Sequence, residues 1–306
     1  MLSAIIISVA QASTTPVLPV RRSFRLMAIP EWWHLLSLDA PTVAALWSWS
    51  MARAVHIPLP RTAPCMLALG TWLVYVGDRI LDGLNKPSGR MQQRHYFYAA
   101  WRQIFLIATI PAAALLLWMV IHSMSPAALR EDIVLLLVAM LYFCLIHIKG
   151  PAVEQWLPKE LTVGVVFACA TAVPTWSRIP PEQRSLFASI VFVFAALCWL
   201  NCVAIQKWEH SQDSETPTHP STQWAQRQFL PLCCVVAVLA LLAATALPLT
   251  MALLLIACAL TAVLFFTLDL LSKRLPFTTL QLRTAADAAL LTPLLFLAIL
   301  KLSGLH

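Results

Sequence analysis

The sequence predicts an all-α protein, a polytopic membrane bundle of nine transmembrane helices. Three observations favour this fold: hydrophobic residues make up 60% of the 306 residues, charged residues only 11%, and the apolar residues occur in long runs. A soluble domain typically carries about 25% charged residues. A helix needs about 20 apolar residues to cross a bilayer, and a backbone in lipid must satisfy its own hydrogen bonds. The apolar runs are therefore expected to be membrane-spanning helices.

The runs are separated mostly by joints that contain proline, where helices begin or end. Their approximate bounds are 36–57, 62–82, 98–122, 131–149, 160–177, 184–208, 229–247, 249–271 and 284–303. The shortest joint is "LPLT", between the seventh and eighth runs. We therefore expect a cytoplasmic or interfacial tail over residues 1–35, followed by a single transmembrane domain over residues 36–306.

The basic residues predict the orientation. With a cytoplasmic N-terminus, fifteen of the 21 Lys and Arg residues fall on the cytoplasmic side: Arg21, Arg22, Arg25, Arg79, Lys86, Arg90, Arg94, Arg102, Lys149, Lys159, Lys207, Arg227, Lys273, Arg274 and Arg283. The other six are Arg53, Arg61, Arg130, Arg178, Arg184 and Lys301. This asymmetry follows the positive-inside rule. We expect an integral multi-pass protein, in the inner membrane if bacterial, whose charge of +7 contacts membrane lipids. Scattered basic residues argue against nucleic-acid binding.

Two pairs of acidic residues stand at the ends of predicted helices. Asp78 and Asp82 end the second run, and Glu209 and Asp213 follow the sixth. Spacing of four residues places both carboxylates of a pair on one helix face, about 6 Å apart along the axis. Mg²⁺ prefers oxygen ligands and is commonly shared between one or two carboxylates and phosphate oxygens. Two such pairs on one membrane side predict a magnesium–diphosphate site, and solvated loop acids are the alternative.

Three further polar residues bear on this site. Asn201 shares a helix face with Glu209 and points toward the predicted site, although an interhelical hydrogen bond is the commoner role for such a residue. Asp39 is expected to cap the first helix. Asp287 lies four residues after Arg283, which predicts a local ion pair. Either aspartate could instead line the polar end of a cavity.

These features resemble the UbiA superfamily of intramembrane prenyltransferases, which have nine helices and acidic motifs after helices two and six. "VYVGDRILD" (74–82) aligns with the family pattern N-D-x-x-D-x-x-x-D. Its last two acids match, whereas Val74 and Tyr75 replace the Asn and the first Asp. "EHSQD" (209–213) matches the second motif, D-x-x-x-D, with Glu for the first Asp.

The resemblance implies Mg²⁺-dependent transfer of an isoprenyl group from an isoprenyl diphosphate to a lipophilic, often aromatic, acceptor. The ion would be held by Asp78, Asp82, Glu209 and Asp213 and would stabilise the departing diphosphate. Basic residues near the carboxylates would neutralise phosphate charge. The candidate diphosphate contacts are Arg79, Lys149, Lys159, Tyr75, Asn201, Arg94, Lys207 and Lys86. For each basic residue, membrane topology alone is the alternative explanation.

Three other functions stay open. A terpene cyclase would bind the same donor without an external acceptor. The loss of the Asn and Asp at Val74 and Tyr75 would suit an inactive membrane assembly partner. A secondary transporter usually binds its cargo near the midplane, on helices broken by Gly or Pro. No proline interrupts the middle of the second or sixth run, which speaks against transport.

Overall fold

The structure, a computed structural model, describes residues 29–85, 97–98, 100–131, 133–134, 137, 158–210 and 219–304. It is all-α. Eleven α-helices have defined bounds in this part of the chain: α3 (Ile29–Leu35), α4 (Asp39–Ala54), α5 (Thr62–Asn85), α7 (Arg102–Ser123), α10 (Lys159–Trp176), α11 (Arg184–His210), α12 (Pro220–Arg227), α13 (Phe229–Ala246), α14 (Leu249–Ser272), α15 (Thr279–Ala289) and α16 (Pro293–Ser303). A short 3₁₀ helix, η4 (Pro181–Gln183), precedes α11.

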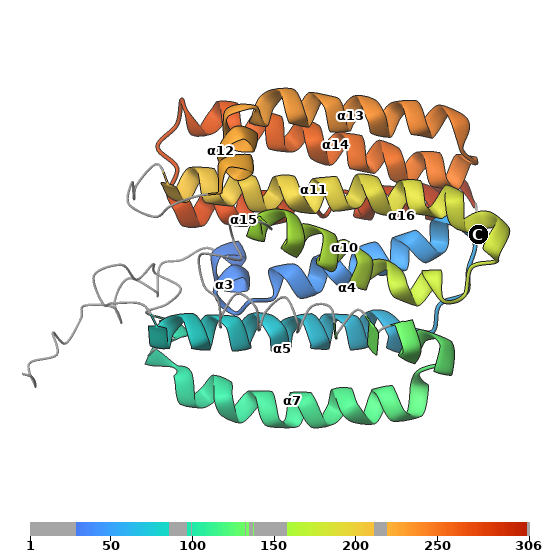
Figure 1. Cartoon of the computed structure of the whole chain (residues 1–306), viewed down its shortest axis with the longest axis horizontal. Helices are drawn as coiled ribbons and strands as arrows, with labels where there is room; N and C mark the ends of the chain where they lie inside the picture. Colours follow the sequence, from blue (N-terminus) through green and yellow to red (C-terminus); the bar gives the residue numbers. More distant parts are fainter. Residues whose placement is uncertain are drawn as a thin grey trace, which may run out of the picture.

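The long helices lie side by side with their axes roughly aligned (Figure 1). Helix α7 packs on α5, α5 on α4, and α4 on α10, while α11 joins these helices to α13 and α14. The main core lies among α4, α10, α11, α13, α14 and the α15–α16 segment. At its centre the rings of Trp47 and Phe194 stack with their centroids 4.1 Å apart. Such contacts between large apolar side chains hold helices together where lipid supplies little hydrophobic driving force.

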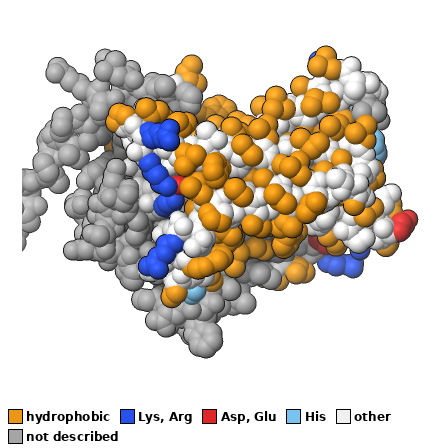
Figure 2. All heavy atoms as spheres, turned by 90° about the horizontal axis from the view of Figure 1, so that it is seen from above, with side chains coloured by type: hydrophobic (Ala, Val, Ile, Leu, Met, Phe, Trp, Pro, Cys, Tyr) orange, Lys and Arg blue, Asp and Glu red, His pale blue; other side chains and the backbone are white. Residues whose placement is uncertain are grey.

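Within the described residues, five segments are long and apolar enough to cross a membrane: Arg102–Ser123, Pro181–Glu209, Phe229–Ala246, Leu249–Ser272 and Thr279–Ser303. The face seen from above in Figure 2 is covered mostly by apolar side chains, with Lys and Arg gathered at one end. Helix α7 buries only Phe105 and Met119, and most of its other apolar side chains are exposed. These observations support a multi-pass membrane protein. Helices α4, α5 and α10 coincide with three other predicted runs, and residues 131–149 lie almost wholly outside the described part, so nine spans remain a prediction.

The last predicted helix, 284–303, is broken rather than continuous. Helix α15 ends at Ala289, and Pro293 opens α16. Proline has no N–H group and tolerates only the first turn of a helix, which explains the break. The freed carbonyls are satisfied, because the indole of Trp47 donates to the Leu290 oxygen at 2.8 Å and the Thr261 hydroxyl donates to the Ala289 oxygen at 3.1 Å. Broken helices are tolerated within membranes where neighbouring side chains satisfy the backbone in this way.

Candidate functional site

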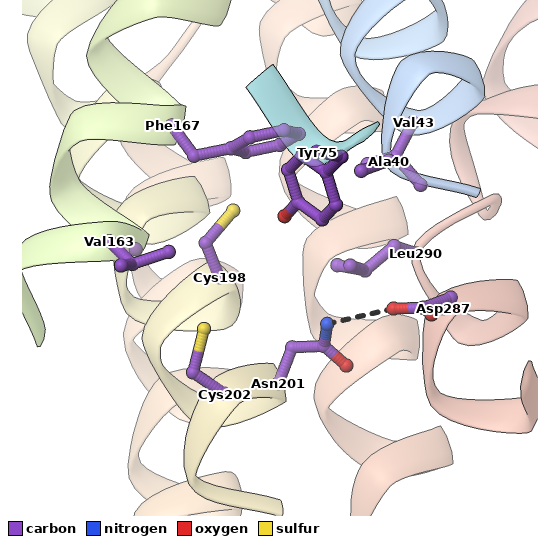
Figure 3. Close-up of a pocket in the computed structure, with 11 residues that line it drawn as sticks. Ala40, Val43, Tyr75, Val163, Phe167, Cys198, Asn201, Cys202, Asp287 and Leu290 are labelled. Atoms are coloured by element: carbon purple, nitrogen blue, oxygen red, sulfur yellow. Dashed lines mark hydrogen bonds between the residues drawn. The ribbon is translucent and has the colours of Figure 1, made fainter. Parts of the chain in front are cut away.

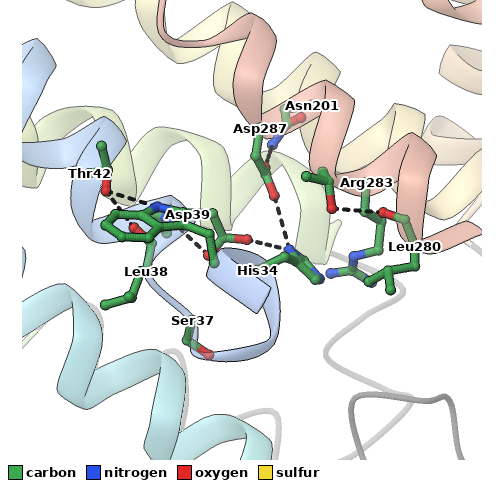
Figure 4. A network of polar contacts seen from close by, with 12 residues as sticks. His34, Ser37, Leu38, Asp39, Thr42, Asn201, Leu280, Arg283 and Asp287 are labelled. Carbon is green, nitrogen blue, oxygen red and sulfur yellow. Dashed lines mark hydrogen bonds and ion pairs between the residues drawn. The ribbon is translucent and has the colours of Figure 1, made fainter. Parts of the chain in front are cut away.

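A buried polar cluster joins three segments at one end of the bundle. His34 lies in α3, Asp39 begins α4, and Asp287 belongs to α15. The Nδ1 atom of His34 hydrogen-bonds the Oδ2 atom of Asp39 and lies 3.5 Å from the Oδ2 atom of Asp287 (Figure 4). His34 is only 1% exposed, and Asp39 is also buried. The sequence therefore folds two carboxylates around one imidazole in the protein interior.

A tight turn between α3 and α4 brings His34 back over Asp39. Within this turn Ser37 has a φ of 56°, a left-handed conformation that is uncommon outside glycine. The Ser37 side chain is buried and its Oγ lies 2.7 Å from the hydroxyl of Tyr98, a hydrogen bond that anchors the turn. Arg79 from α5 donates to the main-chain oxygen of His34 at 3.2 Å. Contacts from α5 and from Tyr98 thus hold the histidine in place.

Each carboxylate of the cluster also accepts a neutral hydrogen bond. The Asn201 amide donates to Oδ1 of Asp287 at 3.0 Å, and the Ala40 N–H donates to Oδ1 of Asp39 at 2.9 Å. Burial lowers the pKa of His34, but hydrogen bonds to Asp287 and Asp39 raise it more, so its pKa lies above the ordinary value. The second oxygen of each carboxylate is directed at His34. The cluster is therefore suited to hold a positive charge, either a proton on the imidazole or a cation.

A small cavity of about 40 Å³ adjoins the cluster, and Asp287 lines both. Tyr75 of α5 and Phe167 of α10 lie on one side of it, with Asn201 and Cys202 of α11 on another (Figure 3). A water molecule needs roughly 10–15 Å³ of such volume, so the cavity has room for a few. Tyr75 and Asn201, both expected near the diphosphate, thus line one cavity between α5 and α11.

The predicted acidic pairs are only partly described. Helices α5 and α11 both end at the same end of the bundle (Figure 1). Asp78 is exposed there, and Glu209 accepts a hydrogen bond from Arg283 of α15. The side chain of Asp82 and the whole of Asp213 lie outside the described residues. The proximity of the two pairs therefore remains a prediction.

The predicted basic contacts divide into three groups. Arg79 is 5% exposed and lies over the Tyr98 ring, 5.7 Å from its centroid. Lys207 donates to Asp269 at 2.7 Å. Lys159 is exposed at the start of α10. The remaining candidates, Lys86, Arg94 and Lys149, lie outside the described residues. Arg79 and Lys207 are thus already engaged by groups of the protein.

Two expectations about the acids need correction. The predicted ion pair between Arg283 and Asp287 is not formed: Arg283 binds Glu209, while Asp287 binds Asn201 and His34. Asp39 is the first residue of α4 rather than its N-cap, which is Leu38, and its carboxylate turns to His34. A charged or protonatable partner from another helix competes successfully with local contacts in a buried site.

His34 was missed by sequence reasoning. It lies in "PEWWHLLSL", whose paired tryptophans suit a membrane interface, so the segment was assigned to the tail. The available signal was the presence of three polar side chains, His34, Asp39 and Asp287, next to apolar runs that have few other charges. An ionisable residue near membrane depth is by default a functional candidate.

Comparison with known proteins gave no match to this chain among family models, curated proteins or solved structures. The function therefore has to be argued from the geometry of the cluster, the cavity and the helix ends.

Proposed function

We propose that this protein is a Mg²⁺-dependent intramembrane prenyltransferase with nine spans and with its N-terminus and acidic motifs on the cytoplasmic side. The observation that carries this proposal is the cavity between α5 and α11, because the two helices that bear the acidic pairs present Tyr75 and Asn201 to it. Tyr75 precedes Asp78 by one helical turn, and Asn201 precedes Glu209 by about two. The cavity, which is lined mostly by apolar side chains, thus has polar groups from both helices within one to about two helical turns of the predicted metal ligands.

The carboxylates would hold Mg²⁺, and the ion would bind the diphosphate of an isoprenyl donor. Asp78, Asp82, Glu209 and Asp213 supply the oxygen ligands that this hard cation prefers. Arg283, in contact with Glu209, joins the basic candidates that would neutralise the remaining phosphate charge. The apolar helices would accommodate the isoprenyl chain and the lipophilic acceptor. Charge stabilisation of the leaving group in a water-poor site would be the main catalytic contribution.

The test is a binding measurement on the purified full-length protein. Mg²⁺ and inorganic diphosphate are expected to strengthen each other's binding, because each neutralises the charge that the other must face. Asp78→Asn should reduce this mutual effect about tenfold or more, and Asp82→Asn or Asp213→Asn should act in the same way. Glu182→Gln is a matched control, since Glu182 is exposed in η4 at the opposite end of the bundle. Isothermal titration calorimetry gives the affinities.

An activity assay then separates the remaining alternatives. The protein is incubated with Mg²⁺ and isoprenyl diphosphates of several lengths, with and without lipid extract, and the release of diphosphate is followed. Release that requires the extract supports transfer to an acceptor. Release without it, together with a cyclic product, supports a terpene cyclase. Diphosphate binding that Asp78→Asn and Asp82→Asn both leave unchanged would contradict the magnesium site and leave an assembly partner as the better explanation.

Tyr75 provides a second prediction. Its hydroxyl points into the cavity (Figure 3), where it can donate to a phosphate oxygen. Tyr75→Phe is expected to weaken diphosphate binding by about 1 kcal/mol, roughly fivefold, the usual net contribution of one hydrogen bond. Tyr98→Phe is the control, because the Tyr98 hydroxyl is directed at Ser37 instead. Equal affinities of the wild type and Tyr75→Phe would place the diphosphate away from the cavity.

One observation favours a second candidate function, secondary transport. The break between α15 and α16 lies close to Asp287, and transporters commonly bind ions where a transmembrane helix is interrupted. Proteoliposomes that accumulate a solute on an imposed proton or sodium gradient would establish transport. Asp287→Asn would then be expected to abolish accumulation. If no gradient drives flux while diphosphate release proceeds, transport is excluded.

A further inference from the structure

We propose that His34, Asp39 and Asp287 bind one divalent first-row transition metal ion, of which Zn²⁺ is representative. This site is separate from the predicted magnesium–diphosphate site, because its ligands lie on α3, α4 and α15 rather than at the ends of α5 and α11. Its existence does not depend on prenyl transfer.

The three donor atoms are close enough to share one ion. A ligand atom from each of His34, Asp39 and Asp287 lies within 4.8 Å of the other two. Ligands about 2.0–2.1 Å from a tetrahedral ion are separated from one another by about 3.3 Å. Shifts of side chains alone would therefore bring the three atoms into coordination distance. Their placement on three different segments means that the fold, and not one local sequence motif, creates the site.

The donor set selects the class of metal. Carboxylate oxygens bind many divalent cations, but an imidazole nitrogen favours zinc, iron, nickel and copper over the hard ions magnesium and calcium. One imidazole with two carboxylates leaves at least one position for water. The cavity that Asp287 lines adjoins the cluster and has room for such a water molecule.

Neighbouring groups already orient the carboxylates as they would around a metal. Metal-bound carboxylates are normally fixed by hydrogen bonds to their other oxygen. Here Asn201 donates to Oδ1 of Asp287, and the Ala40 N–H donates to Oδ1 of Asp39, so that Oδ2 of each faces His34 (Figure 4). Both carboxylates of the proposed site are therefore held in place by hydrogen bonds.

Charge and burial give an independent reason for a cation. The carboxylates of the buried Asp39 and the partly buried Asp287 carry a charge of about −2 when ionised, and burying uncompensated charge is costly. A divalent ion balances both of them and leaves the imidazole neutral. Moreover, Nε2 of the 1%-exposed His34 has no hydrogen-bond partner among the described residues. This nitrogen faces away from the two carboxylates, so it could replace Nδ1 as the ligand atom only if the ring turned over.

The competing explanation is a proton in place of the metal. A protonated His34 between Asp39 and Asp287 would form a structural clamp that fastens α3 to α4 and α15. Both explanations use the same three side chains, so only direct metal binding separates them.

The experiment uses the full-length wild type, purified in detergent and stripped of metal by a chelator. Co²⁺ is titrated as a spectroscopic probe for Zn²⁺, with visible d–d absorption and calorimetry as readouts, and Mg²⁺ is titrated in parallel. We expect one equivalent of Co²⁺ to stay bound in a hundredfold excess of Mg²⁺, which occupies the predicted magnesium site, and we expect Zn²⁺ to displace this Co²⁺. His34→Gln and Asp39→Asn should each weaken Co²⁺ binding at least tenfold. Glu182→Gln, at an exposed position in η4, should leave it unchanged.

Failure of the metal site is distinguishable from failure of the magnesium site. Wild-type protein that takes up no stoichiometric Co²⁺ or Zn²⁺ would overturn the metal site, whatever the diphosphate assays give. So would Co²⁺ binding that His34→Gln leaves intact. If the variants do not fold, the wild type still decides: Zn²⁺ added in an excess of Mg²⁺ should raise its melting temperature further. Equal melting temperatures with and without Zn²⁺ under these conditions would count against the site.

Discussion

Gly164→Ala is expected to destabilise the protein by about 3 kcal/mol, at the upper end of the cost of overpacking a core. A Cβ atom at Gly164 would lie 2.6 Å from the main-chain nitrogen and 2.9 Å from the Cα atom of Trp199 in α11. Because these are backbone atoms, no change of side-chain rotamer relieves the clash, and α10 must move away from α11. Small residues at helix interfaces in membranes allow such close approach. Thermal unfolding of the purified protein gives the change in stability.

Two other helical glycines serve as matched controls. A Cβ atom at Gly70 would make an ordinary contact with a Leu116 side chain at 3.7 Å, and one at Gly77 would meet nothing within 4 Å. Gly70→Ala and Gly77→Ala are therefore expected to be neutral or slightly stabilising, since alanine favours a helix by up to about 1 kcal/mol over glycine. Gly164 also lines the cavity, so separation of the helices should reduce diphosphate binding as well. A melting temperature for Gly164→Ala equal to those of the controls would mean that the two helices are less tightly packed.

Long apolar runs made the helical class readable from the sequence. The bounds of α13 and α14 agree with the predicted runs to within a few residues. Both helices consist largely of apolar residues, and the short Leu247–Pro248 joint marks where α13 ends and α14 begins. The break at Pro293 was not predicted. A proline close to a run of leucines does not by itself show whether a helix bends or stops, and the answer depends here on Trp47 and Thr261, which satisfy the freed carbonyls.

The candidate site was less predictable for a physical reason. Spacing of four residues identifies side chains on one helix face, so the pairs at Asp78 and Glu209 were visible in the sequence. The cluster of His34, Asp39 and Asp287 has no such spacing, because its members meet only after α3 and α4 pack against α15. A local rule also assigned Arg283 to Asp287, whereas Arg283 reaches across to Glu209 on α11. A long side chain can contact residues on other helices, whereas helical spacing identifies only its neighbours on the same helix.

The same competition between partners bears on Lys207, which was expected to contact diphosphate. Its ammonium group donates to Oδ1 of Asp269 at 2.7 Å, and Lys273 lies 3.2 Å from Oδ2 of the same carboxylate. Asp269 is 0% exposed and also accepts from the indole of Trp208 at 3.4 Å. A lysine held in this way is available to a phosphate only if it leaves a buried carboxylate. The position of Lys207 therefore favours a structural role over substrate binding.

Asp269→Asn is expected to destabilise the protein by about 3 kcal/mol, the lower end of the cost of breaking a buried ion pair. The lower end applies because Lys207, which loses its partner, is 25% exposed and regains some hydration. Lys273→Met is the control: this side chain is 56% exposed and should contribute less than about 1 kcal/mol. Unfolding measurements on both variants give the difference in stability.

The variant Lys207→Met tests whether Lys207 also binds the diphosphate. If Lys207 is structural, Lys207→Met lowers stability and leaves the diphosphate affinity of the folded protein unchanged. If instead it lowers that affinity several-fold with little loss of stability, Lys207 exchanges Asp269 for the substrate, and the sequence-based prediction for this residue was right.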